Sequence, residues 1–148
     1  MKKILVIHGP NINLTGTREP GVYGQNTISE INDEIVRFGN NLGFIVDIYQ
    51  SNSEGEIISK IHSALHNDDG IILNAGAYTH YSYAIADALS AVKLPAIEVH
   101  FSNIHAREEF RRKSVLAPSC VGTIAGFGKN SYLLALSAMK TYLEGLEQ

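Results

Sequence analysis

The segment Ile97–Ser114, IEVHFSNIHAREEFRRKS, gathers many side chains that could do chemistry together. It starts as a strand-like apolar run and then holds two histidines, three arginines, three glutamates and an asparagine. Arg107 and Arg111 are four residues apart, so both guanidinium groups can face one side of a helix. Such a pair suits a carboxylate, which predicts a site for a small anion. The alternative is a solvent-exposed helix face with ion pairs such as Glu108 with Arg112.

Further polar side chains follow the ends of three apolar runs that we predict to be strands. The first run ends in the segment His8–Asn11, the third ends at Asn74, and the fourth ends in the segment His100–Ser102. In open α/β sheets, ligands bind beyond the carboxyl ends of the strands, where such loops meet. We therefore expect one pocket there, with His80 in a neighbouring loop. An imidazole in this place could donate a proton near neutral pH.

A long loop, GPNINLTGTREPGVYGQ at residues 9–25, follows the first predicted strand. Connections between a strand and a helix usually have about 2–6 residues, so this length is unusual. Its glycines allow it to bend, and Arg18 and Tyr23 are its most chemically useful side chains. A guanidinium beside a phenol favours tyrosinate, so Arg18 could make Tyr23 a usable base on a lid over the pocket. The alternative is an ordinary surface loop.

Six histidines raise the question of a metal site. The sequence has no HExxH motif and no paired CxxC motifs, and His100 and His105 are five residues apart on a predicted loop. We therefore expect no metal ion. A metal hydrolase that uses His8, His80 and His100 is the alternative, and chelators would inhibit it.

Two other features are predicted to carry no chemistry. The segment GTIAGFGKNS suggests a phosphate loop, but Asn130 follows Lys129 where the Walker pattern needs Ser or Thr. Cys120 has no obvious base and is predicted to be a small core residue. His62 and His66 are predicted to be surface or structural residues.

Apolar runs rich in Ile, Leu and Val alternate with stretches of helical periodicity. The runs lack the alternation of a half-exposed strand, which is typical of parallel strands covered on both faces. The predicted strands are Lys3–His8, Phe44–Tyr49, Gly70–Asn74, Ala96–His100 and Ser119–Ala125. This order predicts an α/β fold of the flavodoxin-like type, a five-stranded parallel sheet with helices on both faces.

Capping signals and apolar stripes predict the helices between these strands. Thr27 with Glu30, and Ser53 with Glu56, each form a capping-box pattern ahead of an apolar stripe. The apolar face of the last helix recurs at steps of three and four, at Tyr132, Leu136, Met139, Leu143 and Leu146.

The helix predicted around Tyr83–Val92, YAIADALSAV, is apolar nearly all round. Such a helix is either deeply buried or part of a contact between subunits. Asp87 is one of its few polar residues. It could be a solvated helix acid, but its apolar setting makes a role at an interface at least as good an interpretation.

The whole-chain properties fit a single domain over residues 1–148, because single domains commonly have about 100–200 residues. The net charge of −3 argues against general nucleic-acid binding, which needs an excess of lysine and arginine. One cysteine excludes an internal disulfide framework and fits a reducing compartment. No apolar run is long enough to span a membrane, and the first run stops at Ile7, too short for a signal peptide. We therefore expect a cytoplasmic protein.

Five sequence blocks lie in order along nearly the whole chain: GPNINLTGTREPGVYG, QSNSEGEIISKIH, ILNAGAYTHYSYAIADAL, IEVHFSNIHAREEFR and GTIAGFG. Together they resemble the type II 3-dehydroquinate dehydratase family. The resemblance implies a flavodoxin-like fold, no metal or organic cofactor, and a homo-oligomer that is a dodecamer of four trimers. It also implies reversible dehydration of 3-dehydroquinate to 3-dehydroshikimate, in the shikimate route to aromatic compounds.

The same resemblance implies catalytic roles for residues of this chain. Tyr23 would be the base that removes a proton beside the ring ketone, and Arg18 on the same lid would stabilise tyrosinate. Asn11 would hold the water that supports the enolate. His100 would be the acid that protonates the departing hydroxyl.

Other residues are implied to bind the substrate or to support the site. Those implied to contact the substrate are Asn74, His80, Ser102, Arg111 and the main chain at Phe101. Arg107 would help to keep Tyr23 ionised, and Glu98 would help to orient active-site groups. Asp87 would reach into the site of a neighbouring subunit.

Four positions depart from the commonest pattern of the family: His8, Thr15, Tyr81 and Phe101. They stand where asparagine, leucine, a small polar residue and a smaller aliphatic residue are usual. They could change the shape of the pocket or the packing of the lid, but none removes a proposed catalytic group. A flavodoxin-like module that binds a small anion without catalysis is the alternative function, and it would work without Tyr23 and His100.

Overall fold

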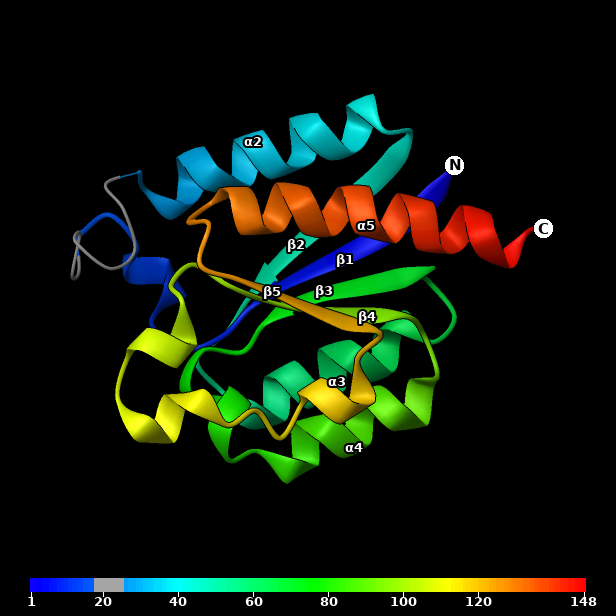
Figure 1. Ribbon diagram of the computed structural model, residues 1–148. Coiled ribbons are helices and arrows are strands. Elements are labelled where there is room, and N and C mark those ends of the chain that lie inside the picture. Colours follow the sequence, from blue (N-terminus) through cyan, green and yellow to red (C-terminus); the bar gives the residue numbers. More distant parts are fainter. Residues whose placement is uncertain (18–25) are drawn as a thin grey trace.

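Five parallel strands form one sheet at the centre of the protein (Figure 1). The structure is a computed structural model that describes residues 1–17 and 26–148. The strands are β1 Lys2–His8, β2 Phe44–Gln50, β3 Gly70–Asn74, β4 Ala96–His100 and β5 Gly122–Ala125, in the spatial order β2-β1-β3-β4-β5. This is the strand order of flavodoxin-like folds, so the predicted fold class is confirmed.

The largest error in the predicted strands is at the start of β5. This strand begins at Gly122 rather than at Ser119, because the residues Ala117–Ser119 form a turn of 3-10 helix. The turn contains Pro118, which has no N–H to donate to a ladder. The strand is therefore shorter than its apolar composition predicts.

Helices cover both faces of the sheet (Figure 1). On one face lie α2 Ile28–Asn41 and α5 Asn130–Leu146, and on the other lie α3 Glu54–Ala64 and α4 Tyr83–Val92. The carboxyl ends of the strands lie opposite the two chain termini, on the side that holds the turns of 3-10 helix that follow β1, β3 and β4 (Figure 1).

The two helical layers explain why the strands have continuous apolar sequences. Successive side chains of a strand point to opposite faces of the sheet. In β1, Ile4 and Val6 belong to the core under α2 and α5, whereas Leu5 and Ile7 belong to the core under α3 and α4. All four are buried, so both faces of β1 carry apolar side chains and the alternation of a half-exposed strand disappears.

The two predicted capping boxes differ in the structure. At α2, the Thr27 side chain accepts from the Glu30 N–H and the Glu30 carboxylate accepts from the Thr27 N–H, which confirms the first box. At α3, Ser53 caps the Glu56 N–H, but the Glu56 carboxylate accepts from Ser51 Oγ at 2.5 Å instead. Ser51 Oγ also accepts from the Ser53 N–H at 2.9 Å, so the reciprocal half of the second box is wrong.

The last two helices bury one face each. α4 turns Ile85 and Leu89 into the core and leaves Asp87 exposed, so this helix is buried on one face only. The apolar stripe of α5 is buried as far as Leu143, but Leu146 is 64% exposed because the last turn extends beyond the sheet (Figure 1). Among the described residues, no helix has both the length and the apolar character needed to cross a membrane.

The charged segment after β4 is not an α-helix. It forms two turns of 3-10 helix, Ile104–Ala106 and Glu109–Arg112. The tighter geometry places side chains three residues apart above one another. Glu108 therefore pairs with Arg111, at 3.0 Å between its Oε2 and the Arg111 Nε, rather than with Arg112 as predicted.

Cys120 lies at the margin of the core under α3 and α4 and is only partly buried. Burial, together with the nearby negative charge of Glu98, raises the pKa of its thiol to about 12. The predicted role as a small core residue therefore describes its packing only in part.

Candidate active site

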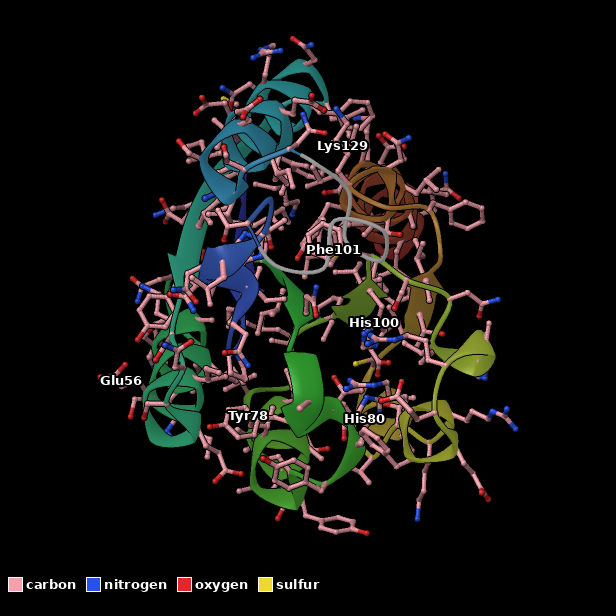
Figure 2. The ribbon with its side chains drawn as sticks, turned by 90° about the vertical axis from the view of Figure 1, so that its left-hand side faces the viewer. Glu56, Tyr78, His80, His100, Phe101 and Lys129 are labelled. Carbon is pink, nitrogen blue, oxygen red and sulfur yellow. The ribbon has the colours of Figure 1, made fainter. Side chains whose placement is uncertain are left out.

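The loops after β1, β3 and β4 enclose a cavity of about 150 Å³ at the carboxyl end of the sheet. Figure 2 looks onto this end of the molecule, with His80 and His100 close together near its centre. The lining residues are Pro10, Asn11, Ile12, Asn74, Gly76, Ala77, His80, His100, Phe101, Ser102, Ile104, Arg107 and Arg111. The predicted site residues among them are Asn11, Asn74, His80, His100, Phe101, Ser102, Arg107 and Arg111. The cavity is below the roughly 300–1,000 Å³ of sites for drug-sized ligands, so it suits a smaller molecule.

The floor of the cavity depends on a close approach of two loops. His8 and Asn74 are partners in the register of β1 and β3, and the Gly9 N–H donates to the Asn74 carbonyl at 2.7 Å. A Cβ at Gly9 would lie 2.6 Å from the carbonyl carbon of Ala75, so only glycine fits here. The first loop then turns at Asn11, whose φ of 68° is one that asparagine tolerates. This path brings Asn11 to the same cavity as Asn74.

His100 and Glu98 form a buried hydrogen-bonded pair at the end of β4. His100 Nε2 donates to Glu98 Oε2 at 2.7 Å, and the two side chains are 7% and 1% exposed. Glu98 Oε1 accepts from Ser114 Oγ at 2.5 Å. Because a carboxylate only accepts, the hydrogen of this bond belongs to Nε2 of His100. No described residue provides a partner for Nδ1, which leaves it for a ligand in the cavity.

His80 lies beside His100 with nearly parallel rings, at 6.4 Å between centroids and 18° between planes (Figure 2). Its Nδ1 donates to the main-chain oxygen of Lys113 at 2.7 Å. Burial lowers the pKa of His80 below its ordinary value, and the charges of His100 and Arg111 lower it further. A neutral His80 with its hydrogen on Nδ1 offers Nε2 as an acceptor for a ligand hydroxyl.

Arg107 and Arg111 bring positive charge to the cavity. Arg107 Nη1 donates to Ser102 Oγ at 3.5 Å, and Arg111 Nε donates to Glu108. The Arg111 guanidinium also lies over the Phe110 ring, 4.6 Å from its centroid. Two guanidinium groups beside hydroxyl and amide donors favour an anionic ligand, as the sequence predicts.

A second polar group, the buried relay, lies beneath the cavity and consists of Asn32, His8, Tyr132 and Asn74. Asn74 Nδ2 donates to Tyr132 Oη at 3.0 Å, and Tyr132 Oη is 2.9 Å from His8 Nδ1. His8 Nε2 is 2.8 Å from Asn32 Oδ1. Burial lowers the pKa of His8 to about 4, despite the hydrogen bond to Asn32, and raises the pKa of Tyr132.

Two members of the buried relay, Tyr132 and Asn32, were not predicted to belong to the site. Tyr132 appeared in the sequence only as one of the apolar positions of α5. The signal that could have found it is its hydroxyl, since a fully buried tyrosine needs a hydrogen-bond partner. Asn32 offers no comparable signal, because polar residues are common on the exposed side of a helix.

Glu98 contacts His100 but does not itself line the cavity, and three further predicted site residues are not placed there. Arg18 and Tyr23 lie outside the described residues. Asp87 is on the exposed side of α4 and does not line the cavity. The metal-hydrolase alternative does not fit the described residues, in which no three His, Cys, Asp or Glu side chains could hold an ion and both ring nitrogens of His8 are occupied. His62 and His66 are exposed, as predicted.

Comparison with known proteins identifies the family. Residues 2–140 match the family model described as dehydroquinase class II. The chain belongs to the class II dehydroquinase family. The resemblance stated from the five sequence blocks is thereby confirmed.

Individual relatives agree with this assignment. The chain is 59% identical to the 3-dehydroquinate dehydratase of Caldicellulosiruptor bescii, over 97% of this chain and 100% of the relative. It is 54% identical to the 3-dehydroquinate dehydratase of Synechocystis, over 97% of this chain and 94% of the relative. The crystal structure of type II dehydroquinase from Butyrivibrio crossotus is similar with a TM-score of 0.92 and 48% identity, over 93% of this chain and 97% of that one. The expected enzyme class, a hydro-lyase, is confirmed by these relatives.

Proposed function

We propose that this protein removes water from 3-dehydroquinate to give 3-dehydroshikimate through an enolate, without a metal or organic cofactor. Membership in the class II dehydroquinase family supports the reaction. The observation that carries the mechanism is the buried Glu98–His100 pair, which leaves one imidazole nitrogen open to a small cavity that also holds two arginines. A carboxylic acid with ring hydroxyls matches the charge and the donors of this cavity.

The first step forms the enolate. Tyr23, as tyrosinate, takes a proton from the carbon beside the ring ketone, and Arg18 and Arg107 stabilise the tyrosinate charge. The electron pair of the broken C–H bond moves onto the ketone oxygen. Asn11 holds a water that donates a hydrogen bond to this oxyanion, a contribution often worth about 3 kcal/mol per donor.

The second step expels the hydroxyl group. The enolate electrons return to form the carbon–carbon double bond while the carbon–oxygen bond breaks, and His100 donates a proton so that water leaves. Nε2 of His100 is bound to Glu98, so the donated proton comes from Nδ1. Tyr23 has gained one proton and His100 has lost one, which balances the reaction.

The remaining cavity residues bind the substrate. Arg111, Asn74, Phe101 and Ser102 line the cavity. The three polar side chains and the main chain of Phe101 donate to the carboxylate and ring hydroxyls. His80 Nε2 accepts from a ring hydroxyl. Uniform contacts of this kind set the affinity for the substrate more than the rate of the chemical step.

We further propose that the protein works in the cytoplasm as a dodecamer of four trimers, in which Asp87 reaches the site of a neighbouring subunit. The exposed Asp87 on α4, beside an exposed Tyr83, supports a contact at this helix. Sedimentation velocity measures the assembly directly. A monomer with full activity would contradict both the assembly and the role of Asp87.

An ultraviolet assay tests the reaction, because the product is a conjugated enone and the substrate is not. The wild type should turn over 3-dehydroquinate with and without EDTA. Tyr23→Phe should fold normally and lose most of the rate, and full activity in that variant would contradict its role as base. A wild type that binds 3-dehydroquinate but does not convert it would favour the non-catalytic anion-binding module instead.

A further inference from the structure

The hydrogen bonds of the buried relay all run in one direction. Asn32 Oδ1 can only accept, so His8 Nε2 must carry the hydrogen and donate to it at 2.8 Å. A neutral imidazole then has a bare Nδ1, which accepts from the Tyr132 hydroxyl at 2.9 Å. The oxygen of that hydroxyl in turn accepts from Asn74 Nδ2 at 3.0 Å.

The last member of the relay, Asn74, is held at both ends of its amide. Its Oδ1 accepts from the Gly76 N–H at 3.2 Å, while one Nδ2 hydrogen goes to Tyr132. A reversed amide would set Oδ1 against a hydroxyl oxygen that already donates elsewhere, and NH2 against the Gly76 N–H. The relay therefore leaves one hydrogen on Asn74 Nδ2 as a donor to the cavity that Asn74 lines.

We propose that His8 and Tyr132 are positioning residues, which fix the Asn74 amide so that it donates to an acceptor oxygen of the bound substrate. This rests on the proposed function, in which Asn74 contacts 3-dehydroquinate. The relay acts through orientation and not through proton transfer, since the phenol and the neutral imidazole keep their protons. His8 and Tyr132 are both fully buried, so water does not readily replace a hydrogen bond that is lost when either side chain is removed.

The imidazole of His8 must stay neutral for this arrangement to persist. A protonated His8 would donate from Nδ1, and the Tyr132 hydroxyl would then face two donors and lose its acceptor. Burial among apolar residues, which lowers the pKa of His8 to about 4, keeps Nδ1 bare at neutral pH. The direction of the relay is therefore set by burial as well as by geometry.

Tyr132→Phe removes the central hydroxyl and keeps the ring, including its edge-on contact with Phe101 at 5.4 Å between centroids. Freed from one partner, the Asn74 amide loses its fixed orientation and its contact with the substrate weakens. We expect KM for 3-dehydroquinate to rise about tenfold while kcat stays within about threefold, since the contact is made equally in ground and transition states. An unchanged KM, or a loss confined to kcat, would overturn the proposal. Partial unfolding cannot imitate the expected result, because a smaller fraction of active protein lowers the apparent kcat and leaves KM unchanged.

Two substitutions of His8 form a matched pair. The Oδ1 of asparagine reaches the place of Nδ1 and accepts from Tyr132, so His8→Asn should keep KM within about threefold of the wild type. The amide of glutamine reaches the place of Nε2, so it can donate to Asn32 but leaves the Tyr132 hydroxyl without its acceptor. His8→Gln should therefore raise KM about as much as Tyr132→Phe. Equal KM values in the two His8 variants would contradict the relay.

Solid-state NMR of protein labelled with ¹⁵N-histidine tests the direction without any assay. The His8 signals, assigned by their absence from His8→Asn, should be those of a neutral ring with hydrogen on Nε2 at pH 7. A ring with hydrogen on Nδ1, or an imidazolium, would overturn the relay whatever the kinetic results of the variants. A wild type that shows the expected tautomer but no turnover would remove the proposed function instead, so the two failures are distinct.

Discussion

His8 and His100 occupy matching places in the sheet but have different chemical surroundings. Each is the last residue of its strand, β1 and β4, and their exposed fractions are 0% and 6%. His8 meets an amide and a phenol, which engage both ring nitrogens. His100 meets the carboxylate of Glu98 at Nε2, and no described residue engages its Nδ1.

The partners of a buried histidine, and not burial alone, decide its chemical role. A ring with both nitrogens occupied by neutral groups holds its neighbours in place and exchanges no proton. A ring with one nitrogen on a carboxylate and the other open to a cavity can give a proton to a ligand. Four experiments test this contrast.

The largest effect should come from His100→Gln. The variant loses the proton donor of the elimination step, and general acids contribute roughly 10²- to 10⁴-fold to a rate, so kcat should fall by about that factor. Steady-state kinetics measures it, with thermal unfolding to confirm the fold. His62→Gln, at an exposed histidine of α3, is the matched control and should behave as the wild type.

The second effect is a dependence of the free energy of unfolding on pH, which the titration of His8 causes. Its pKa is 6.5 in the unfolded chain and about 4 when buried. As the pH falls from 6.5 towards 4, the unfolded state binds a proton that the folded state does not. Stability that is present in full above pH 6.5 is therefore lost progressively, by roughly 3 kcal/mol at pH 4.

His8→Asn removes this titration and isolates its contribution. The free energy of unfolding, from urea denaturation at pH 7 and pH 4, should change less with pH in the variant than in the wild type. The two pH dependences should differ by the roughly 3 kcal/mol assigned to His8. Identical pH dependences would show that the imidazole is not buried in its neutral form.

The third effect is that of Glu98→Gln, which should lower kcat about tenfold, less than the loss of His100 itself. The amide keeps one acceptor oxygen, but Ser114 and His100 now compete for it. The imidazole is then held less firmly beside the cavity. If kcat matched the wild type while the fold was intact, the carboxylate would have no part in orienting His100.

The smallest effect should be that of Asn32→Ala. Asn32 is only half-buried, so a water can take its place beside His8 Nε2. We expect a loss of at most about 1 kcal/mol in the free energy of unfolding and a KM within about twofold of the wild type. If KM rose as much as is expected for Tyr132→Phe, the hydrogen bond between His8 and Asn32 would be the critical bond of the relay.

The sheet was predictable because burial on both faces leaves a nearly continuous apolar run in the inner strands β1, β3 and β4. The edge strands β2 and β5 are partly exposed, so the expected cover on both faces is wrong for them. Local interactions account for the errors. The turn that contains Pro118 makes β5 begin later than predicted. Ser51 donates to the Glu56 carboxylate, which was expected to accept from the Ser53 N–H. The segment after β4 lacks an apolar period, so its sequence could not distinguish a helix from the two 3-10 turns that loop packing produces.

The candidate site was predictable to the extent that it follows the sheet. Polar residues at the ends of parallel strands must meet at one edge, and this placed Asn74 and His100 at one cavity. The relay beneath it was not predictable, because Tyr132 and Asn32 come from two helices that meet only in the folded chain. A buried hydroxyl within an apolar stripe looks like core until its partners are known.

The raised pKa of Cys120 has a practical consequence. The thiolate is the form of cysteine that attacks alkylating reagents, and it is scarce near neutral pH when the pKa is about 12. This thiol is the only one in the chain. A cysteine introduced at an exposed position such as Ser59 on α3 should therefore take a maleimide dye or spin label selectively, with the natural residue left in place.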